Sequence, residues 1–235
     1  MRTIAIGDIH GCSTALLGLL QAINPLPTDT LVFLGDYIDR GPDSRGVIEI
    51  CMAARERCHT VFLLGNHEIM LLGALRGLPQ DHWLASGGKQ TLTSFGGRLE
   101  GIGTRHRQFL SECVHYYETA THIFVHANIR ADLPMRQQDE SSLFWDHLSD
   151  RIPEPHFSGK HVILGHTPQP NGNIGWYGHF TAIDTGCFAD GWLSAIDIAS
   201  QETWQVSKQG HLRERWRILK RVKRHTGRWL RNFRS

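Results

Sequence analysis

Three short apolar runs in the first third of the chain end alike, and this repetition constrains the fold more than any other feature. Residues 3–6, 30–34 and 60–64 are apolar or β-branched, and each run is followed by a glycine and then an aspartate or asparagine. Segments with helical periodicity, 13–23 and 44–57, separate the runs. Short buried strands that alternate with helices are typical of a parallel sheet with right-handed crossovers.

The pattern changes after the third run. Residues 69–117 are mostly helical in pattern, with Gly/Ser/Thr breaks near 86–97, and indicate an inserted helical cap. The polar, proline-punctuated segment 129–160 predicts loops. Further strands are expected at residues 121–125, 161–164, 181–183 and 192–198, with 202–206 as an antiparallel partner.

Polar clusters follow the predicted strands. They read Gly-Asp-x-His-Gly at 7–11, Gly-Asp-x-x-Asp-Arg-Gly at 35–41 and Gly-Asn-His-Glu at 65–68, and two later runs lead into His126 and His166. One such cluster alone is weak evidence, since a single internal histidine is more often structural. In open α/β sheets, however, ligands bind beyond the carboxyl ends of strands, where all five clusters can converge. Aspartate, asparagine and histidine gathered there would form a metal site with oxygen and nitrogen ligands.

This ordered set of motifs resembles the calcineurin-like metallophosphoesterases and, more narrowly, the bacterial serine/threonine phosphoprotein phosphatase family. The resemblance spans about residues 4–190, and segment 83–92 also resembles a stretch typical of the bacterial members. It implies an α/β fold in which a two-sheet β-sandwich is flanked by helices (α/β/β/α). It further implies a metal-dependent hydrolase of phosphoric monoesters. Phosphoserine and phosphothreonine in proteins or peptides would be the substrates, with phosphotyrosine as a further candidate.

The resemblance also implies a dimetal centre, at which a hydroxide bridging the metals attacks the phosphate. Two divalent cations can clamp a phosphate and lower the pKa of a bound water in this way. Mn²⁺ is expected, with Fe or Zn²⁺ as alternatives for this ligand set. The implied ligands are Asp8 and His10 for the first metal, Asp36 bridging both, and Asn66, His126 and His166 for the second.

Three further residues match catalytic positions of the family. His67 matches the general acid that protonates the leaving alkoxide. Asp39 matches the carboxylate that orients this imidazole and raises its pKa. Arg40 matches the arginine that forks onto phosphate oxygens. For Glu68 and for Asp184 the expectation is a supporting contact, because neither matches a residue that performs chemistry.

One segment departs from the family pattern. Members often carry a tryptophan followed two residues later by a second phosphate-binding arginine. Here Trp145 matches, but the arginine position holds His147. Three explanations stay open: His147 contacts the phosphate, Arg130 or Arg151 substitutes for the missing arginine, or the substrate preference differs.

A second substrate class fits the same site. Bacterial hydrolases that cleave dinucleoside polyphosphates symmetrically look similar, but they tend to carry Asp after Gly-Asn-His and Ala in place of Asp39. The presence of Glu68 and of the Asp39–Arg40 pair therefore favours a protein phosphatase.

The charge is unevenly distributed along the chain. Residues 1–207 hold 14 Lys/Arg and 22 Asp/Glu, whereas residues 208–235 hold 11 Lys/Arg and one acid. In the second segment Leu212, Trp216 and Leu219 recur at helical spacing among the bases. We therefore expect a catalytic domain followed by a basic amphipathic tail, which would pack on the acidic body or bind an anionic partner: a membrane surface, nucleic acid or acidic protein.

Composition excludes several classes of protein. At 40% hydrophobic and 20% charged residues, the chain is not of a disordered type. It has no run near the roughly 20 apolar residues that span a membrane. An acid already at Asp8 argues against a signal peptide. Five scattered cysteines without a Cys-x-x-Cys pair indicate reduced thiols that fill the core of a cytoplasmic protein.

Overall fold

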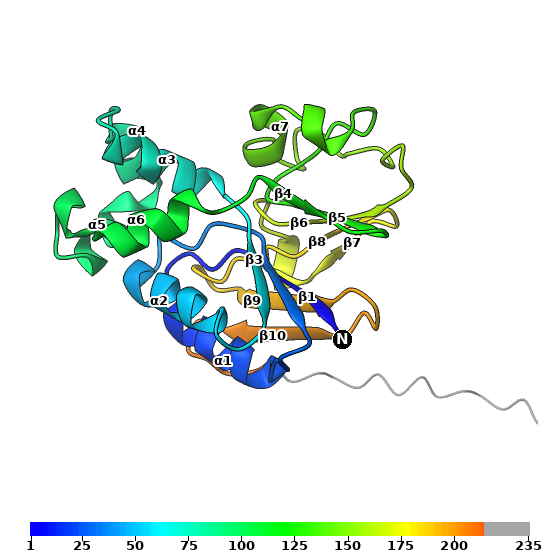
Figure 1. Cartoon of the computed structure of the whole chain (residues 1–235), viewed down its shortest axis with the longest axis horizontal. Coiled ribbons are helices and arrows are strands. Elements are labelled where there is room, and N and C mark those ends of the chain that lie inside the picture. Colours follow the sequence, from blue (N-terminus) through cyan, green and yellow to red (C-terminus); the bar gives the residue numbers. More distant parts are fainter. Residues whose placement is uncertain (214–235) are drawn as a thin grey trace, which may run out of the picture.

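The chain folds into two five-stranded sheets that pack against each other, as the computed structural model shows for residues 1–213 (Figure 1). One sheet contains β1 (Thr3–Ile6), β2 (Thr30–Phe33), β3 (His59–Phe62), β9 (Trp192–Asp197) and β10 (Thr203–Ser207). The other contains β4 (Tyr116–Glu118), β5 (His122–Val125), β6 (His161–Leu164), β7 (Gly175–Trp176) and β8 (Phe180–Ala182). Their strand orders are β10-β9-β1-β2-β3 and β4-β5-β6-β8-β7.

Both sheets have a parallel centre. Strands β1, β2 and β3 run parallel; β9 pairs antiparallel with β1, and β10 pairs antiparallel with β9. Strands β5, β6 and β8 are also parallel, and the short strands β4 and β7 pair antiparallel at the edges. The carboxyl ends of the parallel strands therefore lead into loops at one end of each sheet, where the predicted polar clusters lie.

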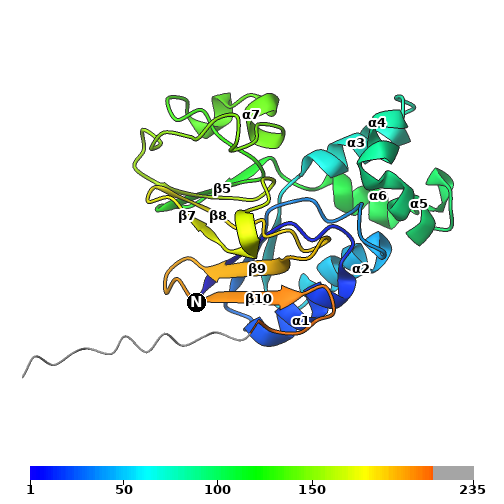
Figure 2. The same ribbon diagram turned by 180° about the vertical axis from the view of Figure 1, so that it is seen from behind.

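Helices cover the outer faces of the sandwich. Helices α1 (Ser13–Ile23) and α2 (Ser44–Ala54) lie below the first sheet, and α1 packs against β9 and β10 (Figure 2). Beyond the second sheet lies α7 (Glu140–Phe144) (Figure 1). A third group beside α2 contains α3 (Asn66–Leu75), α4 (Asp81–Trp83), a π-helical turn (Leu84–Gly88), α5 (Lys89–Ser94) and α6 (Thr104–Ser111). Short 3-10 helices occur at Leu99–Gly101, Met135–Gln137 and Pro170–Gly172.

The predicted two-sheet sandwich flanked by helices is confirmed, with local corrections. The expected helix 44–57 ends earlier, at Ala54. The end of the region expected to be helical, 69–117, contributes strand β4, whose Tyr117 pairs with Phe124 of β5. Strand β7 was not predicted, and α7 lies within a segment expected to be loops. Pairing partners distant in sequence decide such short elements, and local periodicity does not show them.

The predicted basic tail lies mostly outside the described residues. Residues 208–213 fold back along β10, where Leu212 bridges to Val206 and the Arg213 amide donates to the Gln205 carbonyl. The expected helix beyond Arg213 lies outside the described part of the chain. Among the described residues, no helix has the length and apolar character needed to cross a membrane.

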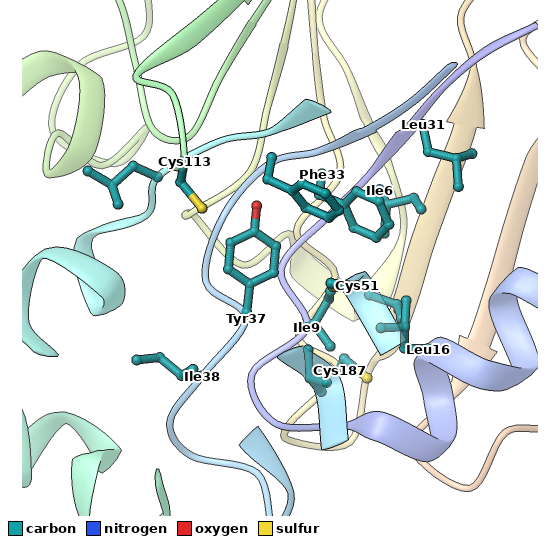
Figure 3. Close-up of a cluster of buried hydrophobic side chains, with 14 of the residues drawn as sticks. Ile6, Ile9, Leu16, Leu31, Phe33, Tyr37, Ile38, Cys51, Cys113 and Cys187 are labelled. Carbon is teal, nitrogen blue, oxygen red and sulfur yellow. The ribbon is translucent and has the colours of Figure 1, made fainter. Parts of the chain in front are cut away.

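The buried apolar side chains form two clusters, the smaller one between the sheets and the larger one under the helices. The layer between the sheets contains Ala5, Val32, Leu63, Phe124 and Ile163. Figure 3 shows part of the larger cluster, in which the Tyr37 ring lies beside Phe33 and its hydroxyl donates to the Leu63 carbonyl at 2.8 Å. All five cysteines are buried and unpaired, which confirms their predicted role as core residues.

We expect Leu16→Ala, in the face of α1 that packs on the first sheet, to lower the free energy of unfolding by about 2–5 kcal/mol. Leu16 is fully buried, so the substitution leaves a cavity. The neighbouring Leu17 is 56% exposed, and Leu17→Ala is the matched control, with an expected change of about 0.5 kcal/mol or less. Urea denaturation monitored by circular dichroism measures both values. Equal losses in the two variants would contradict the packing described here.

Candidate metal centre

Loops that follow β1, β2, β3, β5 and β6 bring the predicted site residues together. The six expected ligands, all buried, are Asp8, His10, Asp36, Asn66, His126 and His166. Two groups of side chains have ligand atoms within 4.8 Å of one another: Asp36 with His126 and His166, and Asp36 with His10 and His67. Asp36 belongs to both groups, as a bridging ligand must.

The backbone of these loops is unusual. Left-handed φ values are uncommon for residues other than glycine and concentrate at functional sites. Among the described residues, eight non-glycine positions have positive φ, and five of them are predicted site residues. They are His10, Asp36, Asp39, Arg40 and His166. Close packing holds the loops in this conformation: Gly41 lies against the His10 carbonyl so tightly that no Cβ would fit.

The carboxylate of Glu68 anchors the loop that carries Asp36. It accepts N–H bonds from Asp36 at 2.8 Å and Tyr37 at 2.9 Å, and from Gly65 at 3.0 Å. Glu68 is fully buried in the first turn of α3. Because Asp36 follows β2 and Gly65 follows β3, one side chain ties two strand ends together. This is the supporting role expected for Glu68.

Two histidines direct an unprotonated ring nitrogen into the site. The Nδ1 atoms of His10 and His126 lie 3.0 Å and 2.8 Å from the carbonyls of Ile38 and Leu34. A carbonyl only accepts, so each Nδ1 carries the proton and donates. Burial lowers the pKa of His10 to about 3 and also lowers the pKa of His126. Both rings are therefore neutral, and each Nε2 carries a lone pair that can ligate a metal.

The surroundings of His126 suit a cation. Its Nε2 lies 3.0 Å from Asn66 Oδ1 and 3.5 Å from Asp36 Oδ1. With the proton on Nδ1, the His126 Nε2 is a lone-pair acceptor like the two oxygens. Acceptors that converge in this way repel one another unless a cation binds between them. The donor set therefore suits a divalent metal ion.

Buried carboxylates also indicate a cation site. Burial raises the pKa of Asp8 well above its usual range, and the carboxylates of Asp184 and Asp36 add to the rise. Burial and the same Asp36 carboxylate raise the pKa of Asp184 to about 6. Both oxygens of Asp8 accept the His166 amide, at 3.0 Å and 3.1 Å. Cations at this position would offset the repulsion among the three carboxylates.

His67 and Asp39 form a hydrogen-bonded pair next to the other side chains of the two candidate ligand groups. The distance from His67 Nδ1 to Asp39 Oδ2 is 2.6 Å, and both side chains are buried. Burial alone would lower the pKa of His67, but the Asp36 and Asp39 carboxylates outweigh it and raise this pKa. An imidazole held with its proton beside a metal site can act as a general acid.

Arg40 lies at the rim of the same groups. Its Nη1 is 3.0 Å from His10 Nε2, and its guanidinium carbon lies 4.6 Å over the Phe188 ring. Phe188, which also contacts the His10 ring edge-on at 5.1 Å, was not predicted as part of the site. No motif marks it, because an aromatic residue in a late loop has no sequence signal for this contact.

His147, at the position that departs from the family pattern, also lies at the site. The exposed His147 packs its ring against that of His166, with centroids 4.3 Å apart. Arg151 is engaged elsewhere, since it donates to Asp146 at 2.7 Å. Arg130 hydrogen-bonds through its backbone to Gln138 and has a half-exposed side chain. Of the three candidates, the structure brings His147 beside an expected metal ligand.

The chain is similar in sequence to known phosphoesterases. Residues 1–196 match the family model described as calcineurin-like phosphoesterase. The chain is 31% identical to serine/threonine-protein phosphatase 1 of Salmonella typhimurium, over 82% of this chain and 90% of that protein. It is 37% identical to the symmetrical bis(5'-nucleosyl)-tetraphosphatase of Janthinobacterium sp., over 55% of this chain and 44% of that protein. The chain thus spans less than half the length of this tetraphosphatase.

A solved structure has the same fold. The cold-active protein-tyrosine phosphatase of a psychrophilic Shewanella superposes with a TM-score of 0.65 at 19% identity. The match covers 90% of this chain and 79% of that one.

We expect Asp36→Ala to lose both metal ions, because it removes the one carboxylate that belongs to both ligand groups. His67→Ala should retain them if His67 acts as an acid and not as a ligand. Metal content of the purified variants, measured by inductively coupled plasma mass spectrometry after loading with Mn²⁺, checks both expectations. Full occupancy in Asp36→Ala would contradict the bridging role, and metal loss in His67→Ala would make that histidine a ligand.

The bond between Asp39 and His67 predicts a pH effect. Asp39→Asn removes a carboxylate that raises the pKa of His67, so this pKa should fall. The protonated imidazole is then lost at a lower pH, and the basic limb of the kcat/KM profile should move to lower pH. Measuring kcat/KM for phenyl phosphate, whose leaving group needs a proton, between pH 5 and 10 tests the shift. An unmoved basic limb would mean that another group sets it.

Proposed function

Since the chain belongs to the calcineurin-like phosphoesterases, we propose that this hydrolase removes phosphate from phosphoserine and phosphothreonine in proteins, with phosphotyrosine as a further substrate. The observation that carries the proposal is the 2.6 Å bond between His67 and Asp39 beside Arg40. Similarity to the Salmonella phosphatase along most of both chains supports it.

The leaving group explains why the His67–Asp39 pair matters. Serine and threonine leave as alkoxides, which are strongly basic and need a proton in the transition state. A nucleotide released from a dinucleoside polyphosphate leaves as a phosphate anion, which is stable without protonation. A protonated imidazole held by a carboxylate is therefore of most use to an enzyme that cleaves alkyl phosphate esters.

Four residues beside the expected metal ligands each have a task in this proposal. Arg40 binds two oxygens of the phosphate with its fork of N–H groups. His67 gives its Nε2 proton to the leaving oxygen, while Asp39 keeps the ring oriented. His147, next to His166, gives the phosphate a further contact in place of the second arginine of the family.

The buried acceptors would hold two divalent cations, proposed to be Mn²⁺. The proposed ligands are Asp8, His10, Asp36, Asn66, His126 and His166. When bound, such ions offset the charge of the phosphate and make water a stronger nucleophile near neutral pH. Carboxylate, amide and imidazole ligands also suit Fe or Zn²⁺.

A second candidate function is the symmetrical cleavage of dinucleoside polyphosphates. The similarity to the Janthinobacterium tetraphosphatase favours it. The same ligand set would serve this reaction, and the two functions differ in how strongly they need His67.

We expect the purified protein with Mn²⁺ to hydrolyse a phosphothreonine peptide faster than diadenosine tetraphosphate. His67→Ala should lower kcat on the peptide by roughly 10²–10⁴-fold, because the alkoxide then leaves without a proton. His59→Ala, at an exposed histidine in β3, is the control and should leave kcat unchanged. Phosphate release from the peptide and nucleotide chromatography measure the two reactions. Turnover of the dinucleotide alone would overturn the proposed protein substrate.

A further inference from the structure

The carboxylate of Asp39 is held by two side chains that lie far from it in the sequence. Trp83 Nε1 donates to its two oxygens, at 3.1 Å to Oδ1 and 2.9 Å to Oδ2. Thr91 Oγ1 donates to Oδ1 at 2.6 Å. With His67 on Oδ2, both oxygens are bound. Asp39 and Thr91 are fully buried and Trp83 is 1% exposed, so no water competes for these bonds.

The same segment also holds the backbone of the turn. The Asp39 amide donates to Thr91 Oγ1 at 2.9 Å, and the Arg40 amide donates to the Gly87 carbonyl at 3.2 Å. The Thr91 hydroxyl also lies 2.8 Å from Ser44 Oγ. A hydroxyl has one donor and two acceptor positions. The Thr91 hydroxyl donates to Asp39 and accepts from the Asp39 amide and from Ser44, so all three positions are used.

The segment around Gly87 packs closely against the Asp39–Arg40 turn. Asp39 and Arg40 have φ values of 70° and 64°, a conformation that neighbours must stabilise. Gly87, with φ 114°, packs against Arg40 so closely that a Cβ would collide with the Arg40 amide nitrogen. The segment 83–91 and the Asp39–Arg40 turn therefore fit together without a gap.

We propose that Trp83 and Thr91 are positioning residues for proton transfer, an inference that rests on the proposed phosphatase activity. The terminal torsion of an aspartate is broad, so one hydrogen bond from His67 would leave the carboxylate plane free to rotate. Trp83 across both oxygens and Thr91 on Oδ1 fix this plane, and Oδ2 stays directed at His67 Nδ1. The helical insertion thus takes part in the chemistry through Asp39.

The test varies the leaving group, because only proton donation depends on it. Phenyl phosphate releases a phenolate that needs a proton, whereas 2,4-dinitrophenyl phosphate releases a stable anion. Trp83→Phe removes one donor to the carboxylate, and Thr91→Val removes the other donor together with the acceptor of the Asp39 amide. Both substitutions keep most of the volume. We expect each to lower kcat on phenyl phosphate by about 10-fold to 100-fold, with KM and the kcat on the dinitrophenyl ester changed by about twofold or less.

Three further variants serve as controls. Thr91→Ser keeps the hydroxyl and should retain most of the kcat on phenyl phosphate. Thr93→Val, in the same helix, removes a hydroxyl that bonds to the Lys89 carbonyl, and Trp204→Phe alters a tryptophan in β10. The last two should leave kcat on both esters unchanged. Thermal denaturation confirms that each variant is folded, and if Trp83→Phe does not fold, Thr91→Val and Thr91→Ser decide the question.

Equal losses on both esters in folded Trp83→Phe or Thr91→Val would overturn the inference, since a purely structural role weakens both reactions alike. Unchanged kcat on both esters would overturn it too. An unmodified enzyme that hydrolyses neither ester would refute the proposed phosphatase activity itself. A failure of the positioning role, by contrast, leaves the unmodified enzyme active on both esters.

Discussion

The hydrogen bonds of one buried carboxylate, that of Glu68, decide the geometry of the whole site. Strands β2 and β3 end side by side, and their loops would otherwise leave several backbone N–H groups buried without partners. Glu68 accepts from Asp36 and Tyr37 on one side and from Gly65 on the other. Asp36 can therefore hold its left-handed conformation and direct its carboxylate between both groups of histidines.

Around this anchor, buried carboxylates and lone-pair acceptors lie close together. Three aspartates are buried close together, and His126 Nε2 lies 3.0 Å from Asn66 Oδ1 and 3.5 Å from Asp36 Oδ1. Such an arrangement is unfavourable for the isolated chain, and positive charge offsets it. The buried acceptors that lie close together and the left-handed turns thus occur at the same place, as expected of a site that can hold cations.

Much of this site could be predicted from the chain alone, because strand ends and motifs are local. A run such as residues 30–34 followed by Gly-Asp specifies where a parallel strand stops, and parallel strands place their carboxyl ends at a common edge. Trp83 and Thr91 could not be identified in this way, because they lie 44 and 52 positions from Asp39 and no spacing rule relates them. Strand β4 was assigned to a helical region for the same reason, since only its pairing with β5 makes it a strand.

The sequence by itself determined the order of the strands along the chain, the polar residues that follow them and hence the chemistry that the site can host. The tertiary structure decided which partners each of those residues has: Glu68 for the Asp36 loop, Trp83 and Thr91 for Asp39, and His147 in preference to Arg151 beside His166. The physical reason is that the ligand types follow from side-chain chemistry, which every residue carries with it. Orientation, protonation and charge balance instead depend on burial and on distances of about 3 Å, which arise only when distant segments pack together.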